Sequence, residues 1–323
     1  MKMPWTILLL VALGWSIPAA AQFKTDKSAG GGIAAQSVQR WRIGVIVTGT
    51  GGSFKRITAT TSAPMDWPEQ HVRIVAEDLS PDVHVTYQMV DEGARQMTIA
   101  IAGLGPGDEA KGLVTFEIQR TIIRPPADTD QYVLADPHRL DRKVAAYLTP
   151  SPYIESDHPE IVALARQIGT DQTVPWNHIE VIYDWVRQKI HYQDVPLKGA
   201  LKGLHDETGD CQELSCLFIA ICRAAKIPAR TVRVPAHCYA EFYLLDGQGV
   251  GHWFPCQPAG AAAFGGIAEL RPILQKGDKV LGIVPGTNRK ERVRFLPDAL
   301  TGIPAGGKPE PPRAKFVCEQ VKE

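Results

Sequence analysis

The chain has 323 residues, and its 35 basic side chains balance its 35 acidic ones, so the formal net charge is zero. This balance gives no electrostatic reason to expect nucleic acid or an acidic membrane surface as a partner. Hydrophobic residues make up 44% of the chain and charged residues 22%, as in an ordinary globular protein. The length predicts two domains.

Residues 1–21 have the pattern of a secretory signal peptide. Lys2 supplies the positive charge, residues 7–15 the apolar region, and the alanines at 19–21 the cleavage site. The alternative is a membrane anchor, but the apolar run is shorter than the ~20 residues of a span. We therefore expect an exported protein, periplasmic or extracellular, with no stable membrane insertion after signal removal. Residues 22–35 are expected to form a flexible leader.

Residues 36–124 are expected to form a small β-sandwich domain, because short strand-like segments alternate with turn signals. Residues 41–47 and 54–60 are predicted to pair as a hairpin. Further strands are predicted at 72–75, 83–87, 96–101 and 112–123. No polar cluster converges in this region, so its expected role is structural or substrate-positioning.

Residues 125–150 are expected as a linker with a short helix at 140–148, and residues 151–300 as a second domain. Helices are predicted from residue 157 and over 175–190, with Trp185 and Tyr192 in the core. Residues 199–208 are expected to form a loop near the site. After late strands at 280–284 and 293–295, residues 301–323 are expected to form a Pro/Gly-rich tail.

The most informative stretch is residues 209–218, a tight turn that opens directly into a buried helix. Leu214 and Leu217 fall at helical spacing, and Gly209 and Asp210 are turn and cap residues, so the helix should begin at or beside Cys211. Unpaired N–H groups and the helix dipole at that position favour a thiolate, which is the nucleophilic form of cysteine.

Three strands are predicted after this helix, over 227–234, 237–244 and 252–258. His237 stands at the start of the second strand, and Gln257 stands at the end of the third. A helix-borne cysteine followed by an antiparallel sheet that carries a histidine and an amide is one way to build a catalytic triad.

Residues 150–300 resemble the transglutaminase-like superfamily, whose fold is papain-like. The matching motifs are Gly209-Asp210-Cys211, the Arg-Ala-Ala-Lys-Ile-Pro-Ala-Arg run at 223–230, the histidine-led strand at 237–241, and Trp253 to Pro258. The resemblance implies an α+β fold, with Cys211 as nucleophile and His237 as base. Gln257 stands where the family usually has aspartate.

A neutral Gln257 can accept a hydrogen bond from the His237 Nδ1–H, as the asparagine of papain-like proteases does, or else the site is impaired. Asp246, in a predicted turn, is an alternative carboxylate. Glu241 is interpreted as a supporting or surface residue. His252 and His205 are rival bases.

The six cysteines of an exported protein suggest disulfides, yet five of them crowd around the predicted site. Cys216 and Cys222, on one helix, are interpreted as small buried hydrophobic residues. Cys238 and Cys256, on neighbouring strands, are a candidate disulfide. No pair has the C-x-x-C spacing of a zinc or redox site, so we predict neither a metal nor another cofactor.

Two functional hypotheses follow. The leading one is an exported cysteine-dependent enzyme, a protease, amidase or transglutaminase, that acts on peptide or glutamine-type amide bonds through a thioester. The competing one is a catalytically silent transglutaminase-like module that binds a peptide or protein. Retention of Cys211 and His237 together favours the enzyme, whereas Gln257 and the nearby cysteines favour the silent module.

Overall fold

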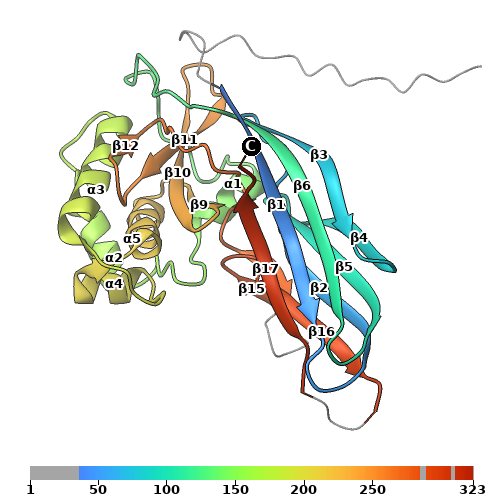
Figure 1. Ribbon diagram of the computed structural model, residues 1–323. Helices are drawn as coiled ribbons and strands as arrows, with labels where there is room; N and C mark the ends of the chain where they lie inside the picture. Colours follow the sequence, from blue (N-terminus) through green and yellow to red (C-terminus); the bar gives the residue numbers. More distant parts are fainter. Residues whose placement is uncertain (1–35, 284–288, 307–309, 323) are drawn as a thin grey trace, which may run out of the picture. The chain divides into compact units, whose positions relative to one another are not determined.

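The computed structural model describes residues 36–283, 289–306 and 310–322 (Figure 1). The predicted signal peptide and leader lie outside the described residues. Within the described ranges, no helix is long and apolar enough to cross a membrane.

The N-terminal strands form two facing antiparallel sheets, which confirms the predicted β-sandwich. One sheet has the order β17-β1-β6-β3, with bounds Arg313–Gln320, Gln36–Thr48, Glu109–Thr121 and Gln70–Leu79. The other contains β4 (Val83–Val90), β5 (Ala94–Leu104), β2 (Phe54–Ala63) and β16 (Ala299–Pro304). Alternate side chains of β1, such as Val45 and Val47, are buried with Ile57 and Ile99 from the opposite sheet.

The hairpin predicted from residues 41–47 and 54–60 is wrong. β1 pairs with β6 and β17, whereas β2 pairs with β5 and β16, so the intervening turn crosses from one sheet to the other. The physical reason is that both strands present a buried apolar face, and the two faces cover each other across the sandwich rather than lying side by side.

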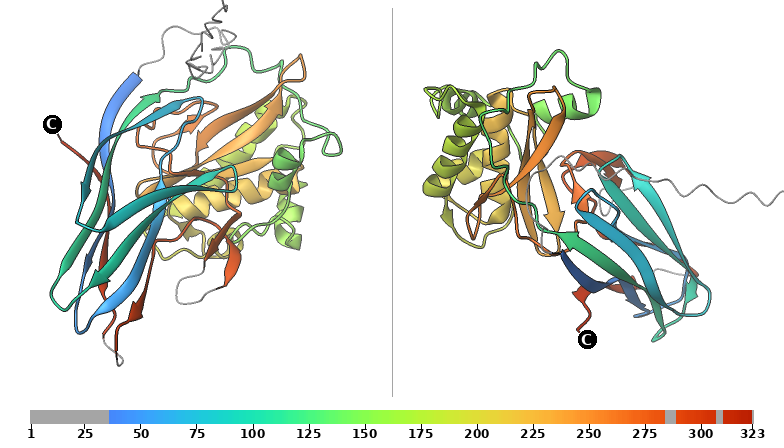
Figure 2. Two further views of the ribbon diagram at one scale, coloured as in Figure 1. Left: turned by 90° about the vertical axis from the view of Figure 1, so that its right-hand side faces the viewer. Right: turned by 90° about the horizontal axis from the view of Figure 1, so that it is seen from above.

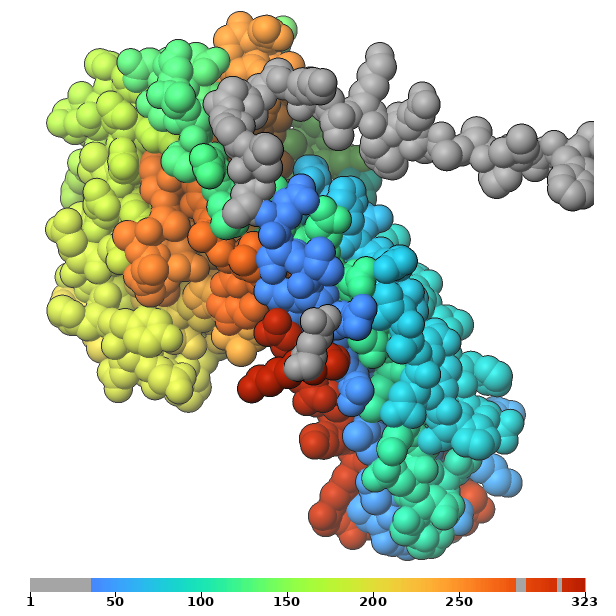
Figure 3. All heavy atoms as spheres, turned by 45° about the horizontal axis from the view of Figure 1, so that its top comes forward, coloured from blue at the N-terminus to red at the C-terminus, as the bar shows by residue number. Residues whose placement is uncertain are grey.

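Residues 301–323 are not only a Pro/Gly-rich tail, because two strands, β16 and β17, include part of this segment. β16 lies along β2, and β17 lies along β1 with Val45 opposite Phe316. Figure 3 shows the red atoms of the C-terminal segment beside the blue atoms of the N-terminal strand. The C-terminal strands therefore complete the sandwich, because β17 satisfies the backbone groups of a β1 edge that would otherwise be open. The domain boundaries proposed from the sequence remain predictions.

The middle of the chain supplies the helices: α1 (Arg142–Ala145), a 3-10 turn η1 (Ala146–Leu148), α2 (Pro159–Ala165), α3 (Pro175–Lys189), α4 (Ala200–Asp206) and α5 (Cys211–Ala224). The short paired strands β7 (His191–Tyr192) and β8 (Thr208–Gly209) flank α4. α4 replaces the loop predicted at 199–208. Its first backbone N–H groups, at Ala200 and Leu201, donate to the carboxylate of Glu155, a cap supplied from a distant part of the chain.

The strands that follow α5 are antiparallel: β9 (Ala229–Val234), β10 (His237–Leu245), β11 (Gly251–Gln257) and β12 (Ala263–Phe264). β13 (Gln275–Lys276) pairs with both β9 and β5, so one sheet of nine strands continues into the sandwich. β14 (Val280–Ile283) and β15 (Lys290–Val293) form a separate pair. α5 packs against β9 and β10, and α2, α3 and α4 pack against α5 (Figure 2).

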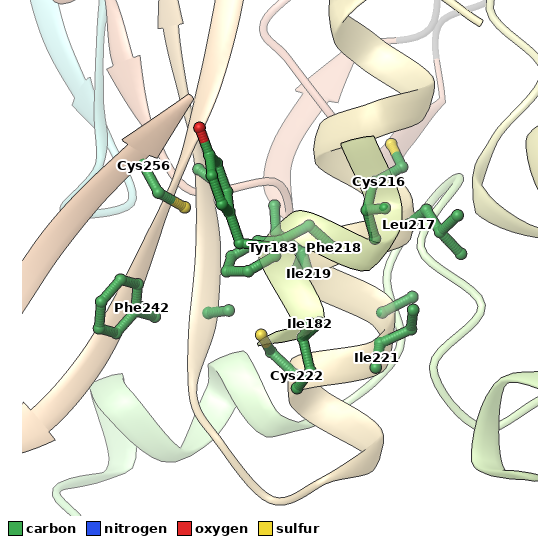
Figure 4. Close-up of a cluster of buried hydrophobic side chains, with 14 of the residues drawn as sticks. Ile182, Tyr183, Cys216, Leu217, Phe218, Ile219, Ile221, Cys222, Phe242 and Cys256 are labelled. Carbon is green, nitrogen blue, oxygen red and sulfur yellow. The ribbon is translucent and has the colours of Figure 1, made fainter. Parts of the chain in front are cut away.

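The core between these helices and the sheet is apolar. Figure 4 shows Phe218 and Cys222 of α5 close to Tyr183 of α3, with Phe242 and Cys256 on the facing strands. The rings of Tyr183 and Phe218 pack edge to face, at 6.4 Å between ring centroids. This packing fixes α5 against the sheet, and with it the positions of Cys211 and the strand-borne residues.

A buried set of charged side chains connects the sheet with the sandwich. Lys276 donates to Glu69 and to Glu241, each at 2.6 Å, and Glu241 also accepts from Arg230 at 2.7 Å. Glu241 is 1% exposed, so the interpretation of Glu241 as a surface residue is wrong and its role is structural support. The carboxylate of Glu241 can be buried because two cations, Arg230 and Lys276, compensate its charge.

Candidate active site

The N-terminus of α5 is fixed by a capping box. The Asp210 carboxylate accepts from the Gln212 N–H at 2.6 Å, and the Glu213 carboxylate accepts from the Asp210 N–H at 3.1 Å. Gly209 permits this arrangement, because a Cβ at that position would lie 2.3 Å from the Glu213 Cβ. Cys211 is therefore the first residue of the helix, as predicted, and is 8% exposed. The sulfur lies beside the positive end of the helix dipole.

His237 is the first residue of β10, and its Nε2 lies 3.1 Å from Oε1 of Gln257, the last residue of β11. The Gln257 amide is oriented by a second bond, since its Nε2 donates to the Ala261 carbonyl at 2.9 Å. Oε1 can only accept, so the His237 Nε2 carries the proton of this bond. The structure thus uses Nε2 rather than the predicted Nδ1, and it leaves Nδ1 for Cys211.

The His237 ring and the Cys211 thiol line the same cavity, and each influences the pKa of the other. Burial disfavours the charged ring, but the contacts with Cys211 and Gln257 outweigh burial and raise the pKa of His237 above its ordinary value. A thiol, an imidazole and an amide are residue types that can serve as nucleophile, base and orienting group.

Cys238 lies against Cys211 and opposes the effect of the helix dipole on the Cys211 pKa. Its Sγ donates to the Cys211 carbonyl oxygen at 3.4 Å. The neighbouring Cys238 thiol, together with burial, raises the pKa of Cys211, whereas His237 opposes the rise. The contact with Cys211 lowers the pKa of Cys238, and the Arg294 guanidinium lowers it further. The two thiols therefore compete for one negative charge.

A cavity of about 300 Å³ opens beside Cys211. Its walls come from the start of α5, from the turn between β9 and β10, and from the segment after β15. The lining residues are Asp210, Cys211, Gln212, Arg233, Val234, Ala236, His237, Cys238 and Phe295. The cavity thus brings the Cys211 thiol and the His237 ring together with room for a small chemical group.

The rival histidines lie elsewhere. His252 Nε2 is 2.8 Å from the Asp246 carboxylate in the turn between β10 and β11, and His205 Nε2 is 2.7 Å from the Glu160 carboxylate. Neither histidine lines the cavity beside Cys211. Asp246 is likewise occupied by His252 and does not reach His237.

All six cysteines are free thiols, so the candidate bridge between Cys238 and Cys256 is wrong. Cys238 faces α5, whereas Cys256 lies within the apolar cluster of Figure 4. Cys216 and Cys222 are buried, in agreement with their interpretation as small hydrophobic residues. Among the residues that the structure describes, no group of histidine, cysteine, aspartate and glutamate side chains could hold a metal ion.

The sequence alone missed three residues near the site. Tyr192, predicted in the core, is instead 65% exposed, and it pairs with Gly209, two residues before Cys211. Arg271 donates to Glu269 and to the Pro235 carbonyl next to His237. Arg294 is buried behind Cys238. The pairing of β7 with β8 sets Tyr192 opposite Gly209, and this register is visible only in the structure.

Comparisons with known proteins agree with this architecture. Residues 162–258 match the family model of the transglutaminase-like superfamily. The fold is similar to that of a candidate cysteine protease from Cytophaga hutchinsonii, at 17% identity and a TM-score of 0.56, over 90% of this chain and 94% of that one. The periplasmic domain of TgpA from Pseudomonas aeruginosa aligns at 14% identity and a TM-score of 0.36, over 72% of this chain and 90% of that domain. No curated protein sequence matches the chain.

Proposed function

Because residues 162–258 belong to the transglutaminase-like superfamily, we propose that this protein is a cysteine-dependent acyl-transfer enzyme with Cys211 as nucleophile, His237 as base and Gln257 as orienting group. The observation that carries the proposal is that Cys211 and His237 line one cavity, with the His237 Nε2 held 3.1 Å from the Gln257 Oε1. A binding module has no need of such an arrangement.

In the first half-reaction, Cys211 transfers its thiol proton to His237 Nδ1 as its sulfur attacks the carbonyl carbon of an amide. Gln257 stabilises the imidazolium that forms, by accepting from Nε2–H. The imidazolium then protonates the departing amine, and a thioester remains on Cys211. The raised pKa of His237 suits a group that must first take the proton and then return it.

The oxyanion of the tetrahedral intermediate would accept from backbone N–H groups at the start of α5, beginning with that of Cys211. We assign the second donor to the Tyr192 hydroxyl. The reasons are that β7 pairs Tyr192 with Gly209, two residues before Cys211, and that the Tyr192 side chain is 65% exposed. In the second half-reaction, water releases a carboxylate, or an amine forms a new amide.

The substrates that fit this chemistry are peptide bonds or glutamine-type amides of a peptide or protein. Export directed by residues 1–21 would bring peptides outside the cytoplasm within reach. The silent module remains the second candidate, and one observation favours it: the Cys238 contact raises the pKa of Cys211 and so opposes formation of the nucleophile.

Acylation by p-nitrophenyl acetate tests the proposal without knowledge of the substrate. We expect a burst of nitrophenol and an acetyl thioester on Cys211 detected by mass spectrometry, both lost in Cys211→Ala and His237→Ala. Cys216→Ala, at a buried position on the same helix, is the matched control and should retain both. Adding a primary amine then separates the acceptors, because an amide product indicates transfer. A folded wild-type protein that is never acylated would support the silent module.

A further inference from the structure

The thiol of Cys238 has no part in acyl transfer, yet it lies against the nucleophile. Cys238 is the second residue of β10 and is 2% exposed. Its Sγ lies 3.4 Å from the Cys211 carbonyl oxygen and 3.9 Å from the Ser215 hydroxyl, and both cysteines line the same cavity. A reagent in this cavity can thus reach Cys211 at the helix start, and Cys238 lies in the wall of the same cavity.

A buried cation stands next to this second sulfur. Arg294 is 3% exposed, and its Nη2 lies 3.7 Å from the Cys238 Sγ, while its Nη1 donates to the Gln212 side chain. Its Nε has no hydrogen-bond partner, and in the described part of the chain no carboxylate pairs with it. A guanidinium remains charged when buried and is stabilised by a nearby anion. The thiolate of Cys238 is the group placed to be that anion, and its lowered pKa agrees.

We propose that Cys238 is the resolving thiol for oxidation of Cys211, so that a peroxide converts the pair to a reversible disulfide that switches the enzyme off. This inference rests on the same reactive Cys211 as the proposed function. It adds a modification site and a chemical class of effector, a hydroperoxide.

The chemistry proceeds in two displacements. The Cys211 thiolate attacks one oxygen of the peroxide, the O–O bond breaks, and Cys211 becomes a sulfenic acid while hydroxide leaves. The Cys238 thiolate then attacks the Cys211 sulfur, the S–S bond forms, the S–O bond breaks, and a second hydroxide leaves. The two thiol protons convert the hydroxides to water. A dithiol reductant reverses the state by thiol–disulfide exchange.

The other cysteines do not compete for this role. Cys222 and Cys256 are fully buried in the apolar cluster, and Cys216 is buried further along α5. Cys318 is exposed on β17 and does not line the cavity. Cys238 itself needs no access to solvent, because its attack on Cys211 is intramolecular and its Sγ already contacts the Cys211 backbone.

The test treats the reduced full chain with hydrogen peroxide and maps each cysteine by differential alkylation and mass spectrometry, with dimedone present in parallel samples. Wild type and the matched control Cys216→Ser should give a peptide that links Cys211 to Cys238, and dithiothreitol should restore alkylation of Cys211 completely. Cys238→Ser, and Cys238→Ala as a second variant, should instead accumulate the dimedone adduct and then sulfinic acid at Cys211, with a loss of alkylation that dithiothreitol does not reverse.

Irreversible oxidation of Cys211 at the same rate in wild type and Cys238→Ser, with no linked peptide, would overturn the inference. Acylation by p-nitrophenyl acetate, measured on the same samples before oxidation, separates the two proposals. A protein that is acylated but forms no disulfide refutes only the resolving role. A protein that forms the disulfide but is never acylated supports the resolving role and refutes the enzyme.

Discussion

Replacing Gln257 with alanine should slow the reaction of Cys211 with iodoacetamide. Proton transfer to His237 creates an imidazolium whose Nε2–H points at Gln257 Oε1 at 3.1 Å, and the variant removes that acceptor. Hydrogen bonds to charged groups typically contribute about 1.5–3 kcal/mol. If this stabilisation is lost as the proton moves, the rate constant falls by about 10- to 150-fold.

The assay is the second-order rate constant for alkylation of Cys211, read from peptide masses because the protein has six free thiols. His252→Ala is the matched control, since His252 bonds Asp246 in a turn outside the cavity and should leave the rate unchanged. The pKa of His237 should also fall in Gln257→Ala, because a contact that raises it is gone. An unchanged alkylation rate in a variant that unfolds at the wild-type temperature would refute the orienting role.

Four further outcomes are expected. Glu241→Gln should lower the free energy of unfolding in urea by about 3–5 kcal/mol, because it leaves buried cations without their partner, and an unchanged value would contradict the buried network. Burial alone would raise the pKa of Glu241, but Arg230 and Lys276 lower it to about 2 from an ordinary 4.5. On acidification, Glu241 therefore takes up a proton at higher pH in the unfolded chain than in the folded protein. Its contribution to stability, about 3 kcal/mol above pH 4.5, should be lost as the pH falls toward 2. A urea midpoint that stays constant over this pH range would contradict the prediction. Cys238→Ala should move the alkylation midpoint of Cys211 to lower pH, because it removes the contact that most raises that pKa, and no movement would disprove the contact. Tyr192→Phe should slow acylation by p-nitrophenyl acetate by about 10²–10³-fold if its hydroxyl is the oxyanion donor, and wild-type acylation would remove it from that role.

The start of α5 could be predicted because its determinants are local. Asp210 and Glu213 form a cap within four residues, and apolar spacing continues the helix to Ala224. The strand order after α5 followed from the same local patterns and from the family resemblance. The fold class, and the segment that carries the candidate site, were therefore predictable from the sequence.

The features that the sequence did not reveal depend on distant partners. α4 is capped by Glu155, 45 residues before Ala200, and β17 acquires its regular structure only by pairing with β1. The pKa of Cys211 depends on Cys238, which lies 27 residues further along the chain on β10. Periodicity and capping rules describe neighbours along the chain, so they cannot specify such contacts.

The central claim is that His237 activates Cys211. The most direct test is the pH dependence of Cys211 alkylation by iodoacetamide in the wild type and in His237→Ala, with the modified sites read by mass spectrometry. We expect Cys211 to react ahead of the buried Cys216, Cys222 and Cys256, and His237→Ala to abolish this preference. Identical profiles in the two folded proteins, or an inert Cys211 in the wild type, would contradict it.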